Sequence, residues 1–240
     1  MTDETKSWLK DVANGALGTI IGILLTFGFD KAVEVHDAHE NYVKITAATI
    51  INLERYVDQI SACKNQLDYI QETLESVSEM DDETLEDSTS IYNFYDIFAE
   101  LSFVQYDRWI EENFITKGEF IDNTDLRLKI GQVYSYKDLS KVEIEAFNKI
   151  RLVQYEKYFD KDCEGVKNPI IEIMQDKSFN KFLLAAYSLQ ANIDSYLKIM
   201  TSELDEIKKI ADIPEEEMKS LRESATKLEN VVNKSYETEE

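Results

Sequence analysis

Glycine and proline are nearly absent from this chain, and their scarcity limits its possible folds more than any other feature. Seven glycines and two prolines occur among 240 residues, and none lies between Gly28 and Gly118. Ordinary proteins contain about 7 % glycine and about 5 % proline, which supply the turns of β-rich and loop-rich folds. We therefore predict an all-α protein built from long, uninterrupted helices.

An apolar stretch near the N-terminus, VANGALGTIIGILLTFGF, occupies residues 12–29 and contains no charged side chain. As a helix it would be about 27 Å long, close to the hydrocarbon thickness of a bilayer. The alternatives are a buried core helix and a cleaved signal peptide. A core helix would show one polar stripe, whereas the large apolar side chains here point all round. A signal peptide would need a better cleavage site than GFDKAVEVHD. We predict a transmembrane helix.

This span implies a single-pass membrane protein. Cys63 and Cys163 lie far apart, without a CxxC spacing, and so predict neither a disulfide framework nor a zinc site. Unpaired cysteines favour a reducing compartment, which places the large domain on the cytoplasmic side.

Small side chains recur at spacings of three and four along the span, on one face of the predicted helix. They are Gly15, Gly18, Thr19, Gly22 and Thr26. Such a face lets two membrane helices approach closely and associate. The alternative is that glycine is simply common in membrane helices. We predict a homo-oligomer that associates through this face.

The remaining sequence divides into helical segments. From Val43 to Val77 apolar residues recur at intervals of three, four and seven, as in a coiled coil or an antiparallel bundle. The predicted organisation is an N-terminal tail (1–11), a transmembrane helix (12–29), a long stalk helix (30–80), an acidic linker (81–90), an antiparallel helical bundle (91–211), and a C-terminal helix and tail (212–240).

Within the bundle region, residues 91–115 are rich in aromatic side chains, including Phe94 and Phe98. We predict that these form core stripes; a ligand-stacking surface is the alternative. Asn123 or Thr124 is expected to cap a short helix through Tyr136. Further helices are predicted at 138–163 and 177–211.

The sequence contains no motif for catalysis, cofactor binding or metal binding. Glycine-rich phosphate loops, GxSxG and HExxH are all missing. His36, His39 and Glu40 share one helix face but supply fewer ligands than a closed zinc site needs. We interpret them as a solvated turn beside the membrane or a pH-sensitive patch. With 48 acidic and 26 basic side chains, the protein should repel nucleic acid.

Three segments carry a family resemblance: IIGILLTFGFD leading into INLERYVDQI, then GEFIDNTDLRLKIGQVY, and then DKSFNKFLLAAYSLQ. With these the chain resembles an uncharacterised family of bacterial, Bacteroidetes-type single-pass membrane proteins. The resemblance implies a helical domain on an N-terminal anchor in the bacterial inner membrane, and it implies no activity.

The function predicted from the sequence is that of a non-enzymatic, membrane-anchored, oligomerising helical scaffold that presents an acidic bundle to a protein partner. One alternative is a membrane-perturbing effector, for example of bacterial antiviral defence, gated by its helical domain. Another is a small-ligand-binding bundle whose pocket is lined by the aromatic residues of 92–114.

Overall fold

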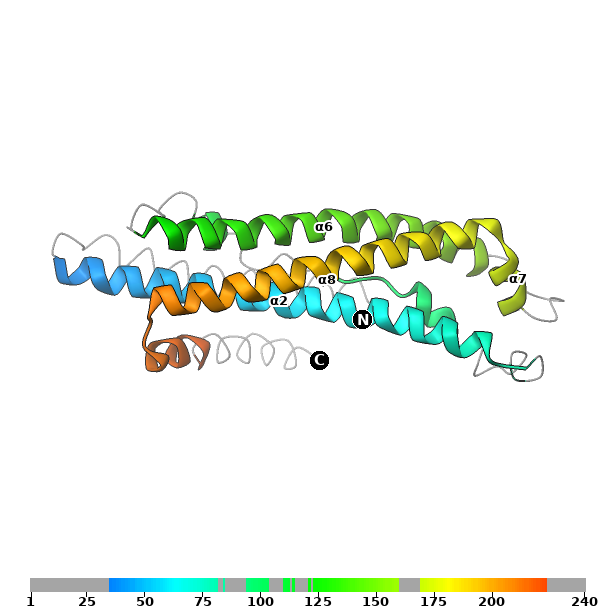
Figure 1. Ribbon diagram of the computed structural model, residues 1–240, viewed down its shortest axis with the longest axis horizontal. Helices are drawn as coiled ribbons and strands as arrows, with labels where there is room; N and C mark the ends of the chain where they lie inside the picture. Colours follow the sequence, from blue (N-terminus) through cyan, green and yellow to red (C-terminus); the bar gives the residue numbers. More distant parts are fainter. Residues whose placement is uncertain are drawn as a thin grey trace, which may run out of the picture. The chain divides into compact units, whose positions relative to one another are not determined.

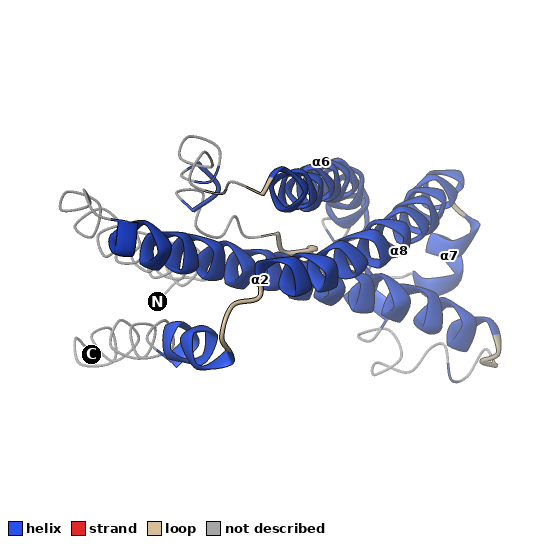
Figure 2. Ribbon diagram, turned by 60° about the vertical axis from the view of Figure 1, so that its left-hand side comes forward, coloured by secondary structure: helices blue, strands red, loops and turns tan. Residues whose placement is uncertain are grey.

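The computed structural model describes residues 35–81, 84, 94–103, 110–112, 114, 121, 123–159 and 169–223. All regular structure in these residues is helical, with no strand among them (Figure 2). The long helices are α2 (Val35–Ser78), α6 (Thr124–Phe159) and α8 (Lys177–Ala211) (Figure 1). Shorter elements are α7 (Pro169–Gln175), the 3-10 turn η1 (Asp96–Phe98) and a helical segment at 215–223. The all-α prediction is confirmed for this part of the chain.

The chain forms two compact units, and each long helix contributes to both. Unit 1 comprises Met1–Asp58, Val104–Ser135 and Ile199–Glu240; unit 2 comprises Gln59–Phe103 and Tyr136–Lys198. In unit 2, Lys157 pairs with Asp176, and Glu143 accepts a hydrogen bond from Asn192. The later residue of α6 therefore contacts the earlier residue near α8. The two helices are antiparallel in this unit, as expected of a helical bundle.

The core of unit 1 combines aliphatic side chains with a buried polar group. Leu53 and Tyr56 of α2 are fully buried, as are Leu126 and Ile130 of α6. Because a buried amide needs a partner, Asn52 accepts a hydrogen bond from the Tyr134 hydroxyl at 3.0 Å. The Tyr134 ring also packs edge-on against Tyr56, with 6.5 Å between centroids. These contacts join α2 to α6 within unit 1.

Charged residues add a second layer of contacts to unit 1. Glu54 on α2 accepts two hydrogen bonds from Arg222, at 2.9 and 3.1 Å, and also pairs with Lys208 on α8 at 2.9 Å. Lys129 on α6 pairs with Glu203 on α8 at 2.9 Å. The bidentate contact of Arg222 links the helical segment at 215–223 to α2.

Sequence signals set two of the helix ends. Asn123 caps α6 because its side-chain oxygen accepts the Leu126 amide at 3.1 Å, so the predicted cap is confirmed. After Ala211 the backbone of Asp212 is left-handed, with φ 46°, and its amide donates to the Lys208 carbonyl at 3.3 Å. This turn, with Pro214 behind it, ends α8.

Helix α6 runs without a break where two separate helices were expected. One helix was predicted to end at Tyr136 and the next to begin at residue 138, with Lys137 between them. Lys137 is only 2 % exposed, and its ammonium pairs with the neighbouring Asp138 at 2.8 Å. Ser140 is buried and donates to the Tyr136 carbonyl one turn earlier. Because Lys137 and Ser140 find partners within α6 itself, both can be buried without interrupting the helix.

Aromatic rings fill the core of unit 2. Phe98 of η1 lies 5.2 Å from Phe182, 6.2 Å from Phe179 and 5.9 Å from Tyr158, measured between ring centroids. Phe94 lies 6.2 Å from Phe179. Both Phe94 and Phe98 are at most 1 % exposed, so the predicted core role of these two residues is confirmed.

None of the described helices is both long enough and apolar enough to cross a bilayer. Charged side chains recur along each long helix, and charges are costly in hydrocarbon. This finding contradicts the predicted localisation as a single-pass protein of the inner membrane, which we therefore correct. The predicted span at 12–29 lies outside the described residues.

Candidate functional site

The residues that the sequence singled out do not form a site in the described part of the chain. The predicted association face, Gly15, Gly18, Thr19, Gly22 and Thr26, lies outside the described residues. His36, His39 and Glu40 fall in the first turns of α2, and their side chains are likewise outside what the structure describes. Among the described residues, no group of three or more His, Cys, Asp or Glu side chains could hold a metal ion.

The densest polar cluster of unit 2 lies where α8 begins. Asp176 precedes the helix and accepts the Ser178 amide at 2.8 Å, so it serves as the N-terminal cap. Lys157 of α6 pairs with the other oxygen of Asp176 and donates to the Ser178 hydroxyl at 2.7 Å. The Lys157 ammonium also lies 5.3 Å from the centre of the Tyr158 ring.

A serine next to a lysine resembles a nucleophile next to its base, but the electrostatics here oppose that chemistry. The hydrogen bond from Lys157 to Asp176 raises the pKa of Lys157 and lowers the pKa of Asp176. Lys157 is therefore held as an ammonium ion and has no lone pair to accept the Ser178 proton. The cluster instead caps α8 and fixes it to α6.

A second polar cluster lies further along the same helix pair. Glu143 of α6 accepts hydrogen bonds from Asn192 at 2.9 Å and from the Tyr196 hydroxyl at 2.7 Å. The bond to the carboxylate raises the pKa of Tyr196. The Tyr196 ring also packs against Tyr136, with centroids 5.5 Å apart. The cluster joins α6 to α8 within unit 2.

Side chains from two helices hold the non-helical segment 99–103 of unit 2, which we call the clamped segment. Asn148 of α6 accepts the Leu101 amide at 3.1 Å and donates to the Leu101 carbonyl at 2.8 Å. Arg151 donates to the Phe98 carbonyl at 2.7 Å. From α2, Cys63 donates to the Ser102 carbonyl at 3.4 Å. These side-chain hydrogen bonds satisfy backbone groups of a segment that belongs to no helix or strand.

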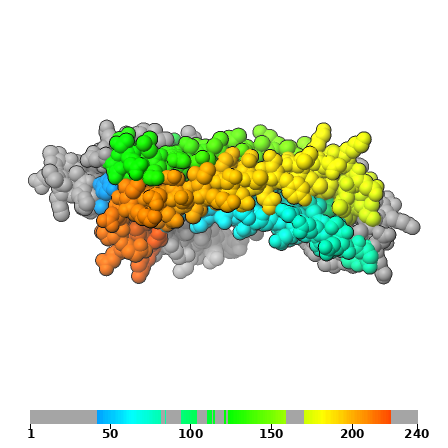
Figure 3. Space-filling view, in the orientation of Figure 1, coloured from blue at the N-terminus to red at the C-terminus, as the bar shows by residue number. Residues whose placement is uncertain are grey.

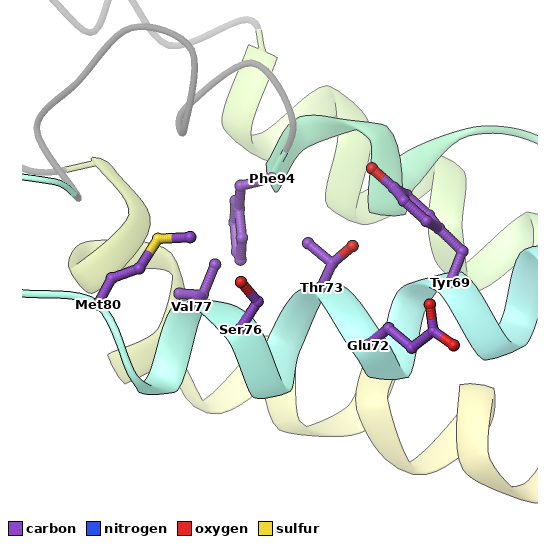
Figure 4. A pocket seen from close by; sticks show the side chains of 7 residues that line it. All are labelled: Tyr69, Glu72, Thr73, Ser76, Val77, Met80 and Phe94. Atoms are coloured by element: carbon purple, nitrogen blue, oxygen red, sulfur yellow. The ribbon is translucent and has the colours of Figure 1, made fainter.

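A small hollow lies beside Phe94 on the surface of α2 (Figure 4). Its volume is about 260 Å³, and its wall is formed by five side chains of α2, from Tyr69 to Val77, together with Met80 just beyond the helix and Phe94. Small-molecule sites commonly occupy about 300–1,000 Å³. Of the described aromatic residues of 92–114, Phe94 alone is among the lining residues. The hollow is therefore a weak candidate for a small-molecule site.

Helix α6 exposes an apolar stripe within unit 2, on its side away from the core. We call it the α6 outer stripe; it consists of Leu139, Val142, Ala146, Ile150 and Val153. Val142 is 63 % exposed, Val153 60 %, Leu139 47 % and Ile150 38 %. The spacings of three and four place all five on one face. Figure 3 shows atoms of α6 in this unit, coloured green to yellow-green, at the molecular surface.

The opposite face of α6 packs in the core of unit 2, through residues such as Ile144 and Phe147. The helix is therefore apolar on two sides. Apolar residues on two faces weaken the helical period of the sequence. The sequence therefore predicted helical structure in this region but did not predict its exposed apolar face.

Comparisons with known proteins find one distant similarity. The chain is 27 % identical over 232 residues to the DNA mismatch repair protein MutS of Caldanaerobacter subterraneus subsp. tengcongensis. The match covers 86 % of this chain and 26 % of MutS, so the chain spans about a quarter of the relative it matches. No family model matches the chain, and no solved structure matches it significantly.

Proposed function

We propose that this protein is a non-enzymatic helical interaction protein that assembles through the α6 outer stripe. The observation that supports the proposal is the exposure of four branched apolar side chains on one face of one helix, led by Val142 at 63 %. Single exposed apolar residues are ordinary, whereas a contiguous apolar face commonly marks a protein interaction site.

The geometry of the stripe favours a helix as the bound element. Its residues lie at i, i+3, i+7, i+11 and i+14, the spacing by which an amphipathic helix packs against another helix. The polar residues that border it, Glu145 and Lys149, are also exposed and can stay solvated at the rim of such a contact.

The similarity to a mismatch repair protein raises DNA as another partner. The net charge of −22 opposes it, because nucleic-acid binding relies on clustered Lys and Arg that neutralise phosphates. The match also covers only 26 % of MutS. We therefore propose a protein partner and carry over none of that relative's activity.

Photo-crosslinking in the cells that naturally make the protein tests this function. We would place p-benzoylphenylalanine at Val142, within the stripe, and in a matched control at Tyr155, which is also exposed on α6 but lies on another side of the helix. The proposal predicts protein adducts from position 142 that clearly exceed those from position 155. Equal, background-level adducts at both positions would refute it.

A further inference from the structure

The α6 outer stripe is symmetric about its central residue. Leu139 and Val153 lie seven residues before and after Ala146, while Val142 and Ile150 lie four residues before and after it. At 3.6 residues per turn all four fall within about 40° of Ala146 around the helix. The pattern therefore reads the same in both directions: two large residues, one small residue, two large residues.

From this symmetry we propose that the stripe binds the same stripe of a second copy of the chain, with the two α6 helices antiparallel and a two-fold axis at Ala146. This inference rests on the proposed function. A two-fold axis brings the same patch of both copies together, so each patch must be complementary to itself. A palindromic stripe satisfies that condition. A stripe that binds an unrelated helix does not need to be palindromic.

The pairing matches large side chains with large ones and leaves the small residue at the crossing. Leu139 would face Val153 of the second copy, and Val142 would face Ile150 of the second copy. Ala146 would face its own counterpart. Helices approach most closely where a small side chain lies at the crossing point, at axial distances near 8 Å. The large pairs on either side then close the contact.

The charges beside the stripe also fit an antiparallel pair. Glu145 and Lys149 lie on the same flank of the stripe, one residue before and three residues after the axis. With a rise of 1.5 Å per residue, each Lys149 would lie about 3 Å along the helix axis from Glu145 of the second copy. The two-fold axis makes two such opposite-charge pairs. A parallel pair would instead place these flanks on opposite sides of the contact, so it would not form these charge pairs.

Cysteine crosslinking in the purified full-length protein tests both the partner and the register. In a Cys163→Ser background, Ala146→Cys should form a reducible covalent dimer under mild oxidation, because identical residues meet only at a two-fold axis. Leu139→Cys and Val153→Cys should each crosslink weakly alone and strongly when the two proteins are mixed. Tyr155→Cys is the matched control for chance collisions. Cys63 is buried, and burial raises its thiol pKa to about 11, so it should not contribute.

Two crosslinking results would overturn the proposal. Dimer formation by Ala146→Cys that is no faster than by Tyr155→Cys would exclude a two-fold contact at this residue. Self-crosslinking of Leu139→Cys that is as rapid as that of Ala146→Cys would indicate a parallel pair.

Sedimentation equilibrium gives an independent reading. Val142→Lys should weaken the dimer at least about tenfold, since it places a charge inside the apolar contact, one helical turn from the two-fold axis. Ser188→Lys, an exposed polar site on α8, should leave the dimer unchanged. Equal effects from the two variants would contradict the inference.

Failure here can be separated from failure of the proposed function. If position 142 crosslinks to a different protein in cells while the purified chain stays monomeric, the interaction function stands and self-pairing falls. If position 142 crosslinks to nothing and the chain is monomeric, both fall.

Discussion

Replacing Asn148 with alanine should destabilise the fold by about 2–4 kcal/mol, a large effect for one partly exposed side chain. Asn148 makes two hydrogen bonds, at 3.1 and 2.8 Å, with the backbone amide and carbonyl of Leu101. Leu101 is 1 % exposed, so water has little access to it. The substitution would leave the buried amide and carbonyl of Leu101 without their side-chain hydrogen-bond partners.

The magnitude follows from the two groups that lose their partners. Each buried polar group left unsatisfied costs about 1–3 kcal/mol, which gives about 2–6 kcal/mol for the pair. Alanine is a better helix former than asparagine by up to about 0.7 kcal/mol, and water that enters the vacated space recovers part of the loss. The net expectation is about 2–4 kcal/mol.

The assay is urea unfolding followed by helical circular dichroism, combined with hydrogen exchange at the Leu101 amide. Asn180→Ala is the matched control, because Asn180 is an exposed asparagine on α8. Asn180→Ala has the same gain in helix propensity but does not remove the hydrogen bonds to Leu101. The reasoning is refuted if the two variants differ by less than about 0.5 kcal/mol, the usual effect of a surface substitution, or if exchange at Leu101 does not accelerate.

Three further predictions address other parts of the molecule. Burial raises the pKa of the Cys63 thiol to about 11, so native Cys63 should resist iodoacetamide at pH 8 and react only on unfolding; fast native alkylation would contradict its burial. Lys157 holds the pKa of Asp176 below its unfolded value near 4, so ionised Asp176 stabilises the fold above that pH and this contribution is lost as the pH falls further. Asp176→Asn should therefore show a shallower decline in stability between pH 4 and pH 2, and an identical decline would refute the assignment. The two-fold dimer of copies that each carry −22 should strengthen as NaCl is raised, because salt screens their repulsion; weakening by salt would indicate that ion pairs, not the apolar stripe, hold it.

Local sequence signals determined the helices of this protein. The helix predicted at 177–211 is present as α8 with the same bounds, because its signals are short-ranged: a capping Asp176, a regular apolar stripe, and Pro214 just beyond its end. The Asn123 cap of α6 and the buried positions of Phe94 and Phe98 followed in the same way. The signals that predicted these features lie within a few turns of one another, although the rings that bury Phe94 and Phe98 come from distant α6 and α8.

Tertiary structure decided which polar residues are satisfied and which apolar residues stay exposed. The sequence predicted two helices that meet at Lys137, whereas in the structure Lys137 is buried within α6 and pairs with Asp138. Asn148 gave no sign that it would clamp Leu101, which is 47 residues away in the chain. Val142 and Ile144 are both apolar residues of α6, yet one is exposed and the other is buried. The spacing of residues predicts which side chains share a helix face. Packing against neighbouring helices determines which of those faces is buried.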